Sequence, residues 1–127
     1  MSAQHSCLII EDEALAIEMM VDYISRRNDL KLVGIASQLS EVEAILQKAT
    51  PAIIFLDLVI PVGEPTTFSY KQLPNTSVIV VVSAMPLSYF RGELPQRKLY
   101  ELAKPLSFEH FDRCINKILQ DKRYTSS

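Results

Sequence analysis

Short apolar runs, separated by stretches with helical spacing, constrain most strongly what this chain of 127 residues can fold into. The four clearest runs are Cys7 to Ile10, Leu32 to Ala36, Ala52 to Leu56 and Val78 to Val82. Three of them are nearly continuous in apolar residues, and such runs are typical of strands that are covered on both faces, as in a parallel sheet. A fifth and weaker run, Leu99 to Ala103, is interrupted by Glu101.

The stretches between the runs carry helical patterns. Apolar residues at helical spacing predict a first helix that buries one face, formed by Ala14, Ile17, Val21 and Ile24. Ser40 and Glu43 fit a capping box at the start of a second helix, which Pro51 would close.

The last stretch predicts a strongly amphipathic helix with Ser107 as its N-cap. Its apolar stripe consists of Phe108, Phe111, Ile115, Ile118 and Leu119. Prolines interrupt the two remaining stretches, 61–76 and 84–98, so their helices are expected to be short, the first at about Thr66 to Gln72.

Strand and helix therefore alternate five times along the chain. This alternation predicts an α/β fold of the flavodoxin-like, doubly wound (βα)5 type, with a five-stranded parallel sheet in the order 2-1-3-4-5. We expect one domain over residues 1–127, with a core at about 6–120 and a flexible tail at 121–127.

Composition and charge exclude several function classes. The net charge is −2 and the pI is about 5.7, without a basic run, so no direct nucleic-acid binding is expected. The apolar runs are far shorter than the roughly 20 residues of a membrane span, and the N-terminus is polar, so a cytoplasmic location without membrane contact is expected. Cys7 and Cys114 are expected as free thiols, with a disulfide as the alternative, and the two histidines have no metal-ligand spacing.

Polar residues follow the apolar runs at the points where the strands would end. Glu11, Asp12 and Glu13 follow the first run, and Asp57 follows the third. Ser83 follows the fourth, and Lys104 follows the fifth. Open α/β sheets bind ligands at the carboxyl ends of their strands, so these side chains are expected to converge.

The chemistry of this set points to a cation and a phosphoryl group. Clustered carboxylates raise one another's pKa values, and a divalent cation relieves the repulsion. Oxygen ligands without Cys or His select Mg²⁺. Asp57 would be an ionised nucleophile, Lys104 could pair with phosphoryl oxygens, and Ser83 could donate a hydrogen bond to them. As alternatives, the acidic run could cap a helix, Ser83 could form a turn, and Lys104 could be a structural ion-pair partner.

The stretches CLIIEDEALA, IIFLDLVIP, VVVSAM and LAKP resemble the receiver domain of bacterial two-component response regulators, and the resemblance covers nearly the whole chain. CLIIEDEALAIEMMVDYI and KPLSFEHF are most similar to receivers that precede LytTR-type DNA-binding domains.

The resemblance implies roles for matching positions. Asp57 would be the phosphoacceptor, Asp12 would bind Mg²⁺ directly and Glu11 through water, and Val59 would offer its backbone carbonyl to the metal. Ser83 would be the switch hydroxyl, and Lys104 would match the lysine that the family carries at this position. The Lys104–Pro105 bond would be cis.

The resemblance also implies partners. These are a sensor histidine kinase, a second copy that would pair through residues 86–118, and a DNA-binding output domain in a longer parent chain, with a stand-alone receiver as the alternative to such a parent. The domain would be a phosphoacceptor with weak autophosphotransfer and autodephosphorylation, and not a turnover enzyme.

The sequence departs from the family at two places. Glu101 stands where an aromatic switch residue is usual, with Tyr100 one position earlier, and Pro65 stands where glycine is usual, with Gly63 two positions earlier. A degenerate receiver that acts as a protein-interaction module is therefore the alternative function. A small phosphatase resembling haloacid dehalogenases is disfavoured, because Val59 replaces the second aspartate of that group.

Overall fold

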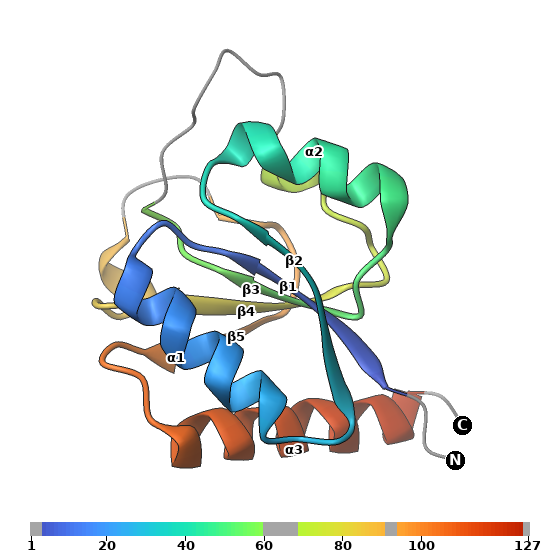
Figure 1. Cartoon of the computed structure of the whole chain (residues 1–127), viewed down its shortest axis with the longest axis vertical. Helices are drawn as coiled ribbons and strands as arrows, with labels where there is room; N and C mark the ends of the chain where they lie inside the picture. Colours follow the sequence, from blue (N-terminus) through green and yellow to red (C-terminus); the bar gives the residue numbers. More distant parts are fainter. Residues whose placement is uncertain (1–3, 60–68, 91–93, 126–127) are drawn as a thin grey trace.

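The computed structural model describes residues 4–59, 69–90 and 94–125. These residues contain a five-stranded parallel sheet in the order β2-β1-β3-β4-β5, which confirms the predicted fold class (Figure 1). The strands are β1 (His5–Ile10), β2 (Leu30–Ala36), β3 (Ile53–Leu56), β4 (Val78–Ser83) and β5 (Leu99–Ala103).

In the described ranges three α-helices cover the two faces of the sheet: α1 (Ala14–Ser25), α2 (Leu39–Lys48) and α3 (Phe108–Thr125). Figure 1 shows α1 and α3 on one face and α2 on the other. Alternate residues of a strand point to opposite faces, so Ile9 and Phe55 pack under α1 and α3, whereas Ile10 and Leu56 pack under α2. Burial on both faces explains why the apolar runs are continuous.

Between β3 and β5 the described residues form two short 3₁₀-helices in place of α-helices, η1 (Tyr70–Gln72) and η2 (Leu87–Tyr89). The prediction of short helices in these two segments is therefore confirmed for their described part, although the helices are of the 3₁₀ type and not α-helices. Prolines lack an N–H donor and clash with the preceding turn, and Pro74, Pro86 and Pro95 limit helix growth here. Thr66, with Gly63 and Pro65, lies outside the described residues.

The buried face of α1 differs from the predicted one. The buried residues are Ala16, Met20, Tyr23 and Ile24, so only Ile24 of the predicted face is buried. The long-range contacts of Tyr23 explain the difference, because its O–H donates to the Leu106 carbonyl at 3.3 Å and its ring packs against Phe108 and Phe111. These contacts turn the tyrosine, and the helix with it, toward α3.

The capping prediction for α2 is wrong by two residues. The helix begins at Leu39, and Glu41 supplies the capping carboxylate instead of Glu43. Glu41 Oε1 accepts hydrogen bonds from the Ser37 hydroxyl at 2.9 Å and from the backbone N–H groups of Ser37 at 2.7 Å and Gln38 at 3.0 Å, and these bonds lower the pKa of Glu41. At α3 the N-cap prediction is confirmed, since Ser107 Oγ accepts the His110 N–H at 3.2 Å.

Helix α3 runs to Thr125, past the predicted end of the core at residue 120. No helix in the described ranges has the length and apolar character that crossing a membrane requires. Cys7 and Cys114 are free thiols, as expected, and burial raises their pKa values to about 12 and about 11. Both are therefore protonated at neutral pH, which makes them poor nucleophiles.

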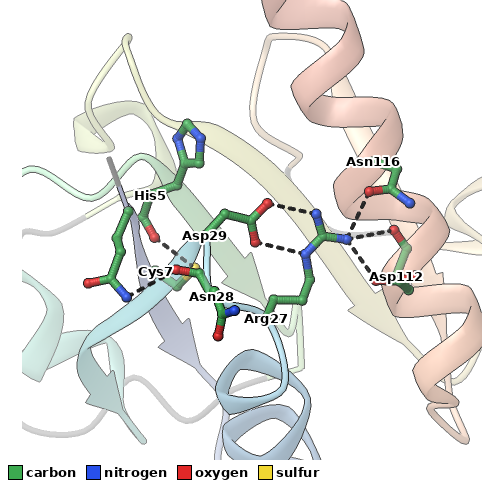
Figure 2. A network of polar contacts seen from close by, with 8 residues as sticks. His5, Cys7, Arg27, Asn28, Asp29, Asp112 and Asn116 are labelled. Carbon is green, nitrogen blue, oxygen red and sulfur yellow. Dashed lines mark hydrogen bonds and ion pairs between the residues drawn. The ribbon is translucent and has the colours of Figure 1, made fainter. Parts of the chain in front are cut away.

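Arg27, just after α1, joins the α1–β2 loop to α3 (Figure 2). Its guanidinium donates two hydrogen bonds to the Asp29 carboxylate, at 2.9 and 2.8 Å. The same guanidinium donates to Asp112 Oδ1 at 2.7 Å and to Asn116 Oδ1 at 2.9 Å. Only 12% of the Arg27 side chain is exposed, and its bonds to Asp29 and Asp112 are partly buried, whereas its bond to Asn116 is exposed.

We expect Arg27→Ala to lower the free energy of unfolding by about 2 kcal/mol at pH 7, because it leaves charged, partly shielded acceptors without their donor. The hydrogen bonds from Arg27 hold the pKa of Asp29 below its ordinary value of 3.8. The ionised Asp29 carboxylate therefore stabilises the folded protein at pH values above 3.8. This stability is lost as the pH falls through the lowered pKa of Asp29. The difference between variant and wild type, measured by urea unfolding, should shrink at low pH.

Arg113→Ala is the control for this prediction, since 74% of the Arg113 side chain is exposed and its contact with Glu109 is 4.0 Å long. A change within about 0.5 kcal/mol is expected for it. If Arg27→Ala lowers the free energy of unfolding by the same amount at pH 7 and at low pH, the result contradicts the proposed role of Asp29.

Candidate phosphorylation site at the carboxyl edge of the sheet

The carboxyl ends of β1, β3, β4 and β5 bring the predicted polar residues to one edge of the sheet. Asp57 directly follows β3, and its backbone N–H donates to the Ile10 carbonyl at 2.9 Å. The N–H of Lys104 donates to the Ser83 carbonyl, also at 2.9 Å. Backbone bonds of the sheet therefore fix where these residues stand, and Asp57 is buried.

Lys104 reaches back across this edge to three carboxylates. Its Nζ lies 2.9 Å from Glu11 Oε1, 3.4 Å from Asp57 Oδ2 and 3.9 Å from Glu13 Oε1. Burial disfavours the charged amine, but the pairs with Glu11 and Asp57 outweigh it and raise the pKa of Lys104. The lysine is thus a fixed positive charge beside the Asp57 carboxylate.

Glu11 directly follows β1 and is buried. Its Oε2 accepts the backbone N–H groups of Asp12 and Glu13, each at 3.2 Å. Burial and the neighbouring Asp57 carboxyl raise the pKa of Glu11 to about 7, against the lowering effect of Lys104. The pocket therefore holds more acidic groups than the single lysine neutralises.

The donor atoms of this pocket fit a hard divalent cation. Glu11, Asp12 and Asp57 each offer a carboxylate oxygen, and these atoms lie within 4.8 Å of one another. Three oxygen donors, without a sulfur or nitrogen ligand among them, suit Mg²⁺. Burial is the main cause of the raised pKa of Glu11, and the neighbouring Asp57 carboxyl adds to it.

An open cavity of about 480 Å³ lies above Asp57 and Lys104, and Ser83 and Val59 also line it. Ser83 Oγ accepts the Met85 N–H at 3.2 Å, and the Val59 N–H donates to Asp57 Oδ1 at 2.9 Å. Asp12, Asp57, Val59, Ser83 and Lys104 thus line the cavity as expected, and Glu11 contacts Lys104 from outside the lining. The sequence did not predict that Glu13 contacts Lys104 or that Met85 lines the cavity, although Glu13 belongs to the acidic run that indicated the site.

The two residues at the unusual switch position point away from each other. Glu101 is exposed, and its Oε2 lies 3.5 Å from the Leu87 N–H of η2. Tyr100 packs on the other face of β5 and donates its O–H to Asp121 of α3 at 2.5 Å. Tyr100 therefore does not take the place of the aromatic residue that the family pattern has at position 101.

Relatives of this chain include regulatory proteins. It is 34% identical over 117 residues to a response regulatory protein of Shewanella oneidensis, covering 91% of this chain and 49% of the relative. It is 30% identical over 112 residues to the transcriptional regulatory protein MalR of Bacillus subtilis, covering 86% of this chain and 48% of the relative. The chain thus spans about half the length of these relatives. No family model matches it.

Solved structures share the fold. The response regulatory domain of MrkE from Klebsiella pneumoniae superposes with a TM-score of 0.71 at 21% identity, over 91% of this chain and 96% of that domain. The sheet order, the similarity in sequence to response regulators and the acidic pocket beside a lysine identify this chain as a response regulator receiver domain.

Proposed function

We propose that this receiver domain accepts a phosphoryl group on Asp57 from the phosphohistidine of a sensor kinase. The observation that carries the proposal is the position of Asp57, a buried carboxylate that opens onto the cavity with Lys104 Nζ 3.4 Å from its Oδ2. Receivers serve two-component signalling, and the acidic cluster and the lysine supply the groups that phosphoryl transfer to a carboxylate needs.

In the proposed step a carboxylate oxygen of Asp57 attacks phosphorus. The new O–P bond forms as the N–P bond to the kinase histidine breaks, and the released imidazole nitrogen takes a proton from solvent. A carboxylate oxygen has no proton to lose when it attacks, so the step needs no general base. Hydrolysis of the resulting acyl phosphate would return the carboxylate and end the signal.

Glu11, Asp12 and Asp57, with the backbone carbonyl of Val59, would hold Mg²⁺, with Glu11 acting through water. The cation would offset negative charge on the phosphoryl oxygens. Lys104 would move from the carboxylates to pair with the phosphoryl group as a second positive charge. Ser83 would exchange its bond with the Met85 N–H for a hydrogen bond that it donates to a phosphoryl oxygen.

The wider setting belongs to the same proposal. The relatives are about twice as long as the matched segment, which supports a parent protein with an output domain. A LytTR-type DNA-binding domain, a cytoplasmic location and pairing of two copies through residues 86–118 are proposed on the family resemblance.

The proposal predicts that acetyl phosphate with Mg²⁺ raises the intact mass of the protein by one phosphoryl group. Chelation of the cation should prevent the gain, because without it the incoming phosphoryl oxygens face the acidic cluster. Mass spectrometry of the intact protein, sampled before the acyl phosphate hydrolyses, measures the outcome. An unchanged mass in the presence of Mg²⁺ would contradict the proposal and favour a degenerate, binding-only receiver.

A further inference from the structure

The side chain of Glu101 in β5 reaches the loop that follows Ser83. Its Oε2 lies 3.5 Å from the backbone N–H of Leu87, the first residue of η2. We propose that this carboxylate holds the loop in its resting position, and so opposes the movement of Ser83 toward a phosphoryl group on Asp57. Glu101 is then a positioning residue that sets how readily the domain takes its phosphorylated form. The inference rests on the proposed phosphorylation of Asp57.

The Leu87 N–H takes its acceptor from outside its own helix. The first N–H groups of a helix have no partner within that helix, and a side chain at the N-cap usually supplies one. At η2 the N-cap is Pro86, which makes no side-chain cap hydrogen bond. The acceptor comes instead from Glu101, 14 positions further along the chain. The start of η2 is thereby joined to β5.

The strand that carries Glu101 is fixed to the sheet. Glu101 pairs with Val81 of β4, and Ala103 pairs with Ser83. One residue beyond β5, the Lys104 N–H donates to the Ser83 carbonyl at 2.9 Å. β5 is therefore a rigid support, from which the Glu101 carboxylate reaches out to the loop.

The loop between Ser83 and Leu87 is only three residues long. At its first end, Ser83 Oγ accepts the Met85 N–H at 3.2 Å, the bond that Ser83 would give up to donate to a phosphoryl oxygen. At its second end, Glu101 accepts the Leu87 N–H. If the loop follows Ser83, this second bond must stretch or break, so its strength favours the resting form over the phosphorylated one.

The length and exposure of the second bond limit the size of this effect. At 3.5 Å the contact is at the long end of the hydrogen-bond range, and it is exposed to water. Its loss should therefore raise the population of the form that binds a phosphoryl group by roughly fivefold. The apparent affinity for a phosphoryl mimic should increase by the same factor.

The test uses beryllofluoride with Mg²⁺ as the phosphoryl mimic and isothermal titration calorimetry as the measurement. Glu101→Ala should bind the mimic roughly fivefold more tightly than the wild type. Glu101→Gln removes the same charge but keeps an oxygen that can accept the Leu87 N–H, so it should stay within about twofold of the wild type. Glu43→Ala removes an exposed carboxylate from α2 and should also stay within about twofold.

Two further measurements link the effect to the loop. In a Ser83→Ala background, Glu101→Ala should change the affinity by less than about twofold, because no hydroxyl draws the loop toward the mimic. In the wild type, the Leu87 amide should exchange with solvent faster once beryllofluoride is bound.

The outcomes separate this inference from the proposed phosphorylation. Equal affinities of wild type and Glu101→Ala would overturn the inference alone. Equal gains for Glu101→Ala and Glu101→Gln, or a gain that persists without the Ser83 hydroxyl, would also overturn it, because the lost charge would then explain the result. Unchanged exchange of the Leu87 amide would show that the loop does not move. A wild type that binds no beryllofluoride would contradict the phosphorylation of Asp57 and this inference with it.

Discussion

Asp57→Asn is expected to abolish incorporation of a phosphoryl group from acetyl phosphate and from a phosphorylated kinase. The amide keeps the shape of the side chain and an oxygen that can accept the Val59 N–H, which Asp57 Oδ1 accepts at 2.9 Å. It lacks the negative charge that makes the carboxylate a nucleophile. The fold should therefore persist while the reaction is lost.

The matched control is Asp22→Asn, which removes a carboxylate on α1 whose side chain is 52% exposed. This variant should gain the mass of one phosphoryl group as the wild type does, and circular dichroism should show both variants folded. Phosphoryl incorporation by Asp57→Asn at the wild-type level would assign the acceptor to another residue.

Lys104→Ala is expected to lower the free energy of unfolding of the metal-free protein by about 3 kcal/mol. The lysine is the cation closest to Glu11 and Asp57 in the described part of the chain, at 2.9 and 3.4 Å. Without it the buried carboxylates lose this positive partner and repel each other more strongly. Urea unfolding at pH 8 gives the measurement, because this pH lies above the raised pKa of about 7 that Glu11 has beside Lys104.

Mg²⁺ should restore part of the stability lost by Lys104→Ala, and should stabilise this variant more than the wild type, because the lysine no longer competes for the same oxygens. Lys31→Ala removes an exposed lysine from β2 and should change stability by less than about 0.5 kcal/mol. If Lys104→Ala lowers the free energy of unfolding no more than the control does, the ion pairs of Lys104 contribute little to the stability of the fold.

The sheet and the convergence of the site could be predicted from the sequence because both depend on local patterns. Continuous apolar runs mark strands that are covered on both faces, and parallel strands must end at a common edge. Asp57, Ser83 and Lys104 each stand at the end of such a run, so their meeting followed from topology. Their hydrogen bonds and ion pairs did not, since those depend on side-chain conformations.

Orientation and capping could not be predicted, because distant contacts decide them. α1 has apolar residues around much of its circumference, and the packing of Tyr23 against Phe108 and Phe111 selects which of them are buried. At α2, Glu41 and not Glu43 caps the helix, because the Glu41 carboxylate can reach the N–H groups of Ser37 and Gln38. Arg27 likewise binds Asp112, which lies 85 positions away in the sequence, and no local pattern predicts this pairing.

The covering of one sheet face by α3 has a consequence for folding during synthesis. The core between α1, α3 and the sheet takes Phe111, Ile115 and Ile118 from the element that follows all the others in the chain. Until residue 118 has left the ribosome, Met20 and Tyr23 lack these partners. The opposite core, under α2, draws its buried residues from positions up to Val81 and can form earlier. The nascent receiver is thus expected to expose its α1 face as a binding site for chaperones until α3 docks.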